Sequence, residues 1–277
     1  MIHGENLAAL RELPDESVDL VYIDPPFNTG GTQSRGRVKV ARDAEGDRVG
    51  FGGHRYRTER LGSPGGFADR FDDYLGFLAP RLDQAARVLK PTGSLYLHLD
   101  YREVHYCKVL LDSVMGRDSF LNEIIWAYDY GARSKRRWPT KHDNILVYVK
   151  DPKQYWFSSD EVDRIPYMAP GLVGPEKAAR GKLPTDVWWH TIVSPTGKEK
   201  LGYPTQKPLG VLRRIVVASC PPGGVVLDAF AGSGTAGAAA LESGRRFILI
   251  DESAEAIAVM RRRFAGAAGV EFEAGPA

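Results

Sequence analysis

The amino-acid sequence predicts an α/β protein built on a doubly wound, mostly parallel sheet. Strand-like and helix-like segments alternate at both ends of the chain, a pattern typical of parallel sheets covered by helices. Residues 225–250 are the clearest case, because a buried strand, a glycine-rich turn, a helix and a second strand follow one another. With 277 residues, the chain is long enough for one large domain carrying an insertion.

Hydrophobic periodicity predicts the individual elements. The expected strands are 1–3, 18–23, 94–99, 120–128, 144–149, 225–229 and 247–250. The expected helices are 6–13, 67–89, 103–115, 206–219, 236–242 and 253–264. Proline and glycine in Lys90-Pro91-Thr92-Gly93 end the second of these helices, since both residues interrupt helical geometry.

Two segments lack sustained periodicity. Residues 28–66 hold eight basic and four acidic side chains, and we expect a long basic loop there. Residues 151–202 are rich in proline and glycine, with scattered tryptophans, and we expect a small irregular insertion. The predicted organisation is therefore a single domain over residues 1–277 with these two additions.

Composition limits the function classes. The net charge of +2 is too small to indicate a polyanion partner, so any nucleic-acid surface must be local. Cys107 and Cys220 lie far apart and fit no metal spacing, as expected for unbridged thiols in a reducing cytosol. The start of the chain is not a signal peptide, and no apolar run is long enough to span a bilayer. We expect a cytoplasmic protein with no metal and no membrane partner.

The segment Asp24-Pro25-Pro26-Phe27 follows directly on the predicted strand 18–23. Each proline lacks an N–H and restricts the residue before it, so the backbone is stiff and presents carbonyl acceptors. A carboxylate, acceptor carbonyls and an aromatic ring together suit an exocyclic amine on a flat heterocycle. An ordinary proline-rich turn with Phe27 in the core is the simpler interpretation.

The glycine-rich turn at Gly232-Ser233-Gly234 predicts a cofactor site at the end of strand 225–229. The next strand ends at Asp251, which is placed to accept hydrogen bonds from ribose hydroxyls. A dinucleotide site has its first glycine directly after the strand, so that pyrophosphate meets the helix N-terminus. Here Asp228 ends the strand and would repel phosphate, whereas it suits a cation such as the amino-acid part of S-adenosylmethionine.

Four motifs together resemble the beta-class DNA amino-methyltransferases. These are Asp24-Pro25-Pro26-Phe27, Lys90-Pro91-Thr92-Gly93-Ser94-Leu95, Tyr203-Pro204-Thr205-Gln206-Lys207-Pro208 and Asp228-Ala229-Phe230-Ala231-Gly232-Ser233-Gly234-Thr235. The resemblance implies a Rossmann-like methyltransferase fold in permuted order, with S-adenosylmethionine as cofactor and S-adenosylhomocysteine as product. It implies Asp24, Pro25, Pro26 and Phe27 as catalytic residues. The cofactor-binding residues that it implies are Glu5, Lys207, Asp228, Phe230, Gly232, Ser233, Gly234, Thr235 and Asp251.

The same resemblance implies adenine N6 of a flipped base in double-stranded DNA as the target, because family members with aspartate at the first motif position usually methylate adenine. The family often has tyrosine where this chain has Phe27 and histidine where it has Tyr203. The segment 151–202, where target recognition is expected, is short. A homodimer and a restriction endonuclease partner are further expectations from the family.

Alternatives remain open from the sequence. They are cytosine-N4 transfer, a catalytically silent DNA-binding module of the same fold, and a nicotinamide oxidoreductase. The basic residues expected to contact DNA phosphates are Arg35, Arg37, Arg133, Lys135, Arg136 and Arg137. A cluster of His98, Asp100, Glu103 and His105 has no metal-ligand spacing that we recognise.

Overall fold

A computed structural model describes residues 1–34, 38–45, 48–49, 55–60, 66–131, 133–194 and 196–276. The chain divides into two compact units, which are Met1–Asn28 with Phe71–Ala277, and Thr29–Arg70.

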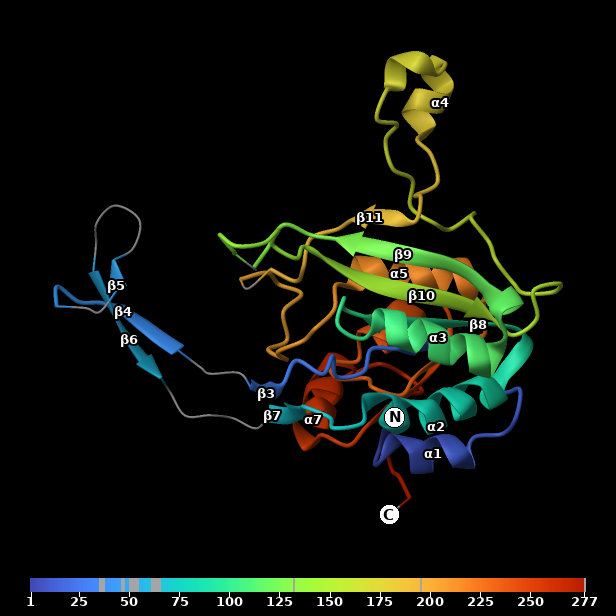
Figure 1. Cartoon of the computed structure of the whole chain (residues 1–277), viewed down its shortest axis with the longest axis horizontal. Helices are drawn as coiled ribbons and strands as arrows, with labels where there is room; N and C mark the ends of the chain where they lie inside the picture. Colours follow the sequence, from blue (N-terminus) through green and yellow to red (C-terminus); the bar gives the residue numbers. More distant parts are fainter. Residues whose placement is uncertain are drawn as a thin grey trace. The chain divides into compact units, whose positions relative to one another are not determined.

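Nine strands of the described residues form one sheet in the first unit (Figure 1). In spatial order they are β11 (Val187–Trp189), β9 (Phe120–Ala127), β10 (His142–Val149), β8 (Leu89–Leu99), β2 (Val18–Ile23), β12 (Val225–Asp228), β13 (Arg246–Asp251), β1 (Ile2–His3) and β14 (Glu273–Ala274). All neighbours are parallel except β10, which is antiparallel to β8 and to β9. The predicted mostly parallel sheet is confirmed.

Helices cover both faces of this sheet. They are α1 (Asn6–Glu12), α2 (Tyr74–Val88), α3 (Val104–Met115), α5 (Leu209–Ser219), α6 (Thr235–Glu242) and α7 (Ala254–Arg263). Side chains of β2 alternate between two hydrophobic cores, as the two-residue period of a strand requires. Leu20 and Tyr22 pack with the helices α5 to α7, whereas Val21 and Ile23 pack with α1 to α3. The doubly wound arrangement is therefore confirmed.

The segment 151–202 is irregular for most of its length. Its short elements are the 3₁₀ turn η3 (Pro170–Leu172), the helix α4 (Pro175–Arg180) and the edge strand β11. Backbone hydrogen bonds between Ile165 and Lys182 close the base of an arm that carries α4, which extends beyond β11 in Figure 1. The 3₁₀ turn η2 (Arg117–Ser119) precedes β9.

The second unit differs from the loop that we expected over residues 28–66. Its described residues form two antiparallel ribbons: β3 (Gly31–Ser34) with β7 (Gly66–Asp69), and β6 (Arg55–Arg60) with both β4 (Val38–Arg42) and β5 (Arg48–Val49). Charged residues interrupt the apolar alternation of these short strands, so periodicity did not reveal them. Arg35 and Arg37 lie outside the described residues.

The helix predicted over residues 67–89 was also wrong at its start. Strand β7 occupies its first residues, and α2 begins only at Tyr74. The side chain of Asp73 accepts a hydrogen bond from the Gly76 N–H at 2.8 Å, which caps the helix there. The apolar spacing that predicted one helix runs through both β7 and α2. Strand pairing in β7 and the Asp73 cap of α2 set the observed boundary between them.

Asp19 joins three neighbouring strands of the sheet near their N-terminal ends. Its buried Oδ2 accepts hydrogen bonds from Lys90 Nζ at 2.8 Å and from the Val225 N–H at 2.9 Å. It therefore connects β2 to the starts of β8 and β12. No apolar side chain could satisfy both donors.

We expect Asp19→Ala to lower the free energy of unfolding by about 2 kcal/mol, because it leaves a buried N–H without its charged acceptor. Urea denaturation measures this change. Asp15→Ala is the control, because Asp15 pairs with Arg87 at the surface and is 74% exposed. The control should cost less than about 1 kcal/mol. An equal loss in both variants would contradict the role of Asp19.

Candidate active site

The two ends of the chain meet where β2 and β12 pair in parallel. Tyr22 lies opposite Asp228 in the register of these strands. Asp24 follows β2, and the glycine turn follows β12, so both lie at the carboxyl edge of the sheet. Ligands bind at this edge in open α/β sheets. Residues separated by about 200 positions therefore face one site.

Asp24 forms an ion pair with Lys207. Lys207 Nζ donates to Asp24 Oδ2 at 2.5 Å, and the two side chains are only 13% and 15% exposed. The second carboxylate oxygen, Asp24 Oδ1, is buried and accepts no hydrogen bond from the residues that the structure describes. Lys207 was expected at the cofactor, but it reaches the predicted catalytic carboxylate. Asp24 thus retains one acceptor position for a further donor.

The turn after Asp24 is held in place by Asn28. Asn28 has a positive φ of 54°, which asparagine tolerates better than most residues. Its amide donates to Glu103 Oε1 at 2.8 Å and accepts from the Phe71 N–H at 3.0 Å. Pro25 is buried, and the Phe27 ring packs at 5.9 Å from the ring of His98 and 5.0 Å from Lys207 Nζ. Phe27 is partly exposed beside the ion pair.

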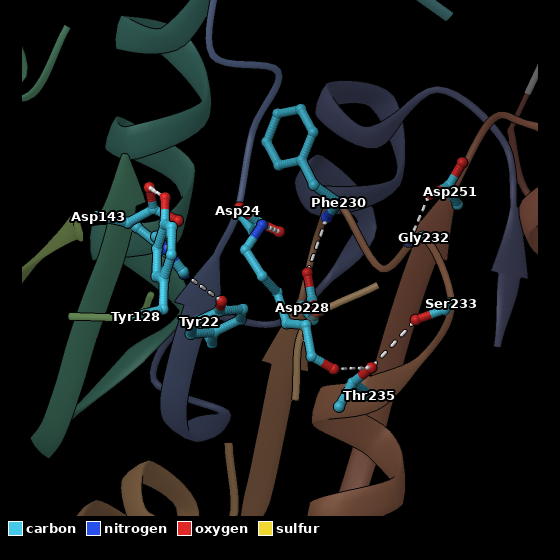
Figure 2. Close-up of polar contacts among 12 residues, drawn as sticks. Tyr22, Asp24, Tyr128, Asp143, Asp228, Phe230, Gly232, Ser233, Thr235 and Asp251 are labelled. Carbon is cyan, nitrogen blue, oxygen red and sulfur yellow. Dashed lines mark hydrogen bonds and ion pairs between the residues drawn. The ribbon is translucent and has the colours of Figure 1, made fainter. Parts of the chain in front are cut away.

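Hydrogen bonds fix the glycine turn after β12 (Figure 2). Asp228 Oδ1 accepts from the Phe230 N–H at 3.0 Å, and Asp251 Oδ2 accepts from the Gly232 N–H at 2.7 Å. Gly234 is the N-cap of helix α6 and has φ of +73°, and a Cβ there would lie 2.9 Å from Met260 Cγ. A side chain at this position would be strained in both backbone and packing.

Two hydroxyl groups connect the glycine turn to the backbone of Lys207, the cationic member of the ion pair. Ser233 Oγ lies 3.0 Å from Thr235 Oγ1, which donates to the Lys207 carbonyl at 3.3 Å. Thr235 is the first residue of α6, and Lys207 lies two residues before α5. The predicted cofactor turn and the predicted catalytic carboxylate are therefore linked through Lys207.

Two buried carboxyl groups give the turn its electrostatic character. Burial raises the pKa of Asp228 well above its ordinary value, and the nearby Asp24 raises it further. Burial also raises the pKa of Asp251, although its backbone hydrogen bonds from Ser253 and Gly232 oppose this. Such a site disfavours an anionic ligand and favours a cation, whose charge would stabilise the ionised carboxylates.

Glu5 has a structural role in addition to its place at this edge. It caps α1 through a 2.7 Å hydrogen bond from the Ala8 N–H, and it pairs with Arg81 at 2.5 Å. Burial alone would raise the pKa of Glu5, but these hydrogen bonds and the Arg81 charge lower it. The Arg81 guanidinium stacks over Phe77, whose ring lies 6.1 Å from that of Phe230. This chain of contacts connects Glu5 to the glycine turn.

A buried polar network beside Asp24 was missed in the sequence. The Tyr22 hydroxyl lies 2.7 Å from His98 Nδ1, and His98 Nε2 lies 3.2 Å from Asp143 Oδ2. The Tyr128 hydroxyl donates to Asp143 Oδ1 at 3.0 Å. Burial alone would raise the pKa of Asp143, but the hydrogen bonds from His98 and Tyr128 and the charge of Lys207 lower it. A proton on Nε2 of His98 satisfies every member of this network.

A cavity of about 240 Å³ lies next to this network. Its walls include Trp126, Tyr128, Tyr130, Asp143 and Lys207. Three of these residues alternate along the end of β9 and its following loop, and the rings of Trp126 and Tyr128 lie 5.2 Å apart. The cavity is thus lined by both aromatic and charged side chains. A flat polar ring is the kind of ligand that such walls accept.

Four of the six residues predicted to contact DNA lie in the loop between β9 and β10. Arg133, Lys135, Arg136 and Arg137 are all exposed there. His98 belongs to the buried network, and no group of three or more metal-ligating side chains occurs among the described residues. Within the same residues, no helix has the length and apolar character needed to cross a membrane.

We expect Asp228→Asn to stabilise the ligand-free protein increasingly as the pH rises. A raised pKa in the folded state means that the native carboxyl contributes stability at low pH and loses it on ionising. The two proteins should differ little below the ordinary carboxyl pKa and diverge above it. Thermal denaturation between pH 4 and about pH 8 tests this. A difference that does not change with pH would contradict it, and exposed Asp118→Asn is the control.

Comparison with known proteins identifies the family. Residues 18–262 match the family described as DNA methylase. The DNA adenine methyltransferase YhdJ of Escherichia coli (strain K12) is 30% identical over 276 residues, which cover 95% of this chain and 81% of YhdJ. The type II methyltransferase M.HpaI of Haemophilus parainfluenzae is 30% identical over 266 residues, which cover 95% of this chain and 73% of M.HpaI.

Solved structures share the fold. The crystal structure of the M1.HpyAVI-SAM complex aligns with a TM-score of 0.61 at 20% identity, covering 95% of this chain and 98% of the other. The cytosine-N4-specific PvuII DNA methyltransferase aligns with a TM-score of 0.63 at 16% identity, covering 97% and 86%. The family and fold inferred from the motifs are confirmed. The chain belongs to the DNA methylase family and is an S-adenosylmethionine-dependent DNA methyltransferase.

Proposed function

We propose that this protein transfers a methyl group to adenine N6 of a flipped base in double-stranded DNA. The observation that carries the proposal is Asp24, which presents a buried, unpaired carboxylate oxygen beside the glycine turn. Family members with aspartate at this motif position usually methylate adenine, and this chain has the same residue there. The name of YhdJ, a DNA adenine methyltransferase, supports the same target.

Asp24 and the Pro25 carbonyl would accept hydrogen bonds from the target amine. An aromatic amine is a weak nucleophile because its lone pair is delocalised into the ring. Two acceptors on its hydrogens favour a tetrahedral nitrogen with a freer lone pair, and this positioning is the main catalytic contribution of these residues. The bound sulfonium supplies the methyl group; the amine loses one proton, and a thioether leaves. Phe27 would stack on the flipped base.

The glycine turn would hold the cofactor. The buried acids Asp228 and Asp251 suit the cationic sulfonium and the ribose hydroxyls. Backbone at Phe230, Gly232, Ser233, Gly234 and Thr235 would approach the cofactor closely. We assign Glu5 to the adenine end from the family resemblance, and Lys207 to the boundary between cofactor and target from its ion pair with Asp24. The donor set therefore fits S-adenosylmethionine.

The proposal extends to partners and location. A restriction endonuclease partner is supported by relatives named type II methyltransferases. The homodimer is proposed from the family resemblance, and the cytoplasmic location from the two unbridged cysteines. The single-domain organisation, with residues 151–202 in target recognition, is part of the same proposal.

Sequencing of DNA after expression in a host without DNA methylation tests the function. We expect N6-methyladenine at one defined sequence. N4-methylcytosine in place of N6-methyladenine would support the alternative, which the fold of the PvuII enzyme also accommodates. Unmodified DNA from cells that contain the folded protein would overturn the proposal and favour a silent binding module.

We expect Asp24→Ala to reduce methyl transfer by at least about 1,000-fold, because it removes an acceptor that acts on the reacting amine. Binding of S-adenosylmethionine, measured by isothermal titration, should change by less than about 10-fold, since Asp24 lies on the target side of the site. Exposed Asp118→Ala is the matched control. Retained activity in Asp24→Ala would exclude this catalytic role.

We expect the combined change of Arg133, Arg136 and Arg137 to alanine to reduce the salt slope of DNA binding by about 2 to 3, since each phosphate contact contributes about 0.9. Fluorescence anisotropy of a labelled duplex at several salt concentrations measures this slope. Arg11, Arg261 and Arg262 are exposed at the C-terminal ends of α1 and α7 and provide the control triple variant. An unchanged slope would remove this loop from the DNA interface.

A further inference from the structure

Trp138 stands out in the loop between β9 and β10. Its side chain is 95% exposed, although tryptophan has much apolar surface to bury. Single exposed apolar residues are common, so exposure alone assigns no role. The position of Trp138 indicates a role, because Trp138 directly follows the exposed basic residues Lys135, Arg136 and Arg137.

The loop that carries Trp138 is tied down at several points. The Tyr128 N–H donates to the Lys141 carbonyl at 2.9 Å, and Lys141 Nζ donates to the Gly131 carbonyl at 2.8 Å. Ser134 Oγ accepts from the N–H groups of Arg136 and Arg137 at 3.1 and 3.2 Å. Trp138 therefore lies in a turn that is held by several hydrogen bonds.

This loop borders the cavity beside the catalytic motif. β10 starts beside the end of β8, since Asn144 pairs with Leu99, and β9 ends opposite His142. The loop between β9 and β10 thus lies at the same sheet edge as Asp24. Its first residues, Tyr128 and Tyr130, line the cavity, and so does Asp143 at the start of β10.

We propose that Trp138 inserts into the DNA base stack at the position that the target base vacates. This inference depends on the proposed function, in which the base leaves the duplex. A flipped base leaves a gap, and an aromatic ring that fills the gap recovers stacking without reading sequence. The adjacent arginines and lysine would hold the phosphates beside the gap. In this arrangement, the target base leaves the duplex and the ring of Trp138 takes its place in the base stack.

Two duplexes separate this role from ordinary DNA binding. Both carry the sequence found to be methylated in cells, and in one of them an abasic site lies opposite the target base, so that flipping is easier. We expect Trp138→Ala to lower kcat/KM on the intact duplex by between about 5-fold and about 150-fold. On the abasic duplex the loss should be less than about 3-fold. Trp138→Phe should retain most activity on both.

Leu241→Ala is the matched control. Leu241 is an exposed apolar residue, 42% accessible, at the C-terminal end of α6, which is the end away from the glycine turn. It should leave activity on both duplexes unchanged. Equal losses for Trp138→Ala on both duplexes, or no loss on the intact duplex, would overturn the insertion.

A fluorescence measurement makes the test independent of methyl transfer. Binding of any duplex that contains an abasic site should quench tryptophan emission in the wild-type protein, and Trp138→Phe should lose most of that quenching. Quenching that is identical in the two proteins would overturn the insertion. A wild-type protein that binds DNA but transfers no methyl group would instead overturn the proposed function, so the two failures are distinguishable.

Discussion

The parallel pairing of β2 with β12 is the constraint on which the site depends. Three register pairs, from Leu20 with Val226 to Tyr22 with Asp228, join segments separated by about 200 residues. This pairing places the proline-rich turn and the glycine turn side by side at one edge. Both strands are fully buried, so a slip of one residue would move apolar side chains between the two cores. The stability of the core therefore sets the geometry of the site.

The site concentrates negative charge at a cost in stability. Asp24 and Asp251 each raise the pKa of Asp228, and burial opposes ionisation of Asp228 and Asp251. Of these three carboxylates, only Asp24 forms an ion pair within the described residues, with Lys207. A cationic ligand would offset this repulsion, so the arrangement is better suited to the bound state than to the free one. Function and stability are opposed here for an electrostatic reason.

The target side of the site is organised differently. Tyr22, His98, Asp143 and Tyr128 come from consecutive positions across the sheet and satisfy one another's hydrogen bonds. A fully satisfied buried network is rigid, because each rotation would leave an unpaired polar atom. The His98 ring of this network packs against Phe27, and Tyr128 and Asp143 form part of the cavity wall. The loop that carries Trp138 begins at Tyr128, a member of this network. The exposed Trp138 side chain is therefore attached to a rigid part of the structure.

The fold class, most of the elements, and the catalytic and cofactor motifs can be recognised from the sequence alone. These features are local, since prolines stiffen Asp24-Pro25-Pro26-Phe27 and glycines permit the turn at Gly232 and Gly234. Periodicity located the central strands because burial on both faces makes them apolar. Resemblance across several motifs then identified the family. Each of these signals lies within about ten residues.

Tertiary structure decided the remaining features. Lys207 reaches Asp24 across 183 positions, and Tyr22 meets His98 across 76, so no local pattern could reveal either contact. The strands β11 and β14 are too short for periodicity and exist because a neighbouring strand pairs with them. The ribbons within residues 29–70 are likewise defined by pairing rather than by an apolar face. Contacts between distant side chains depend on register and packing, which only the folded chain specifies.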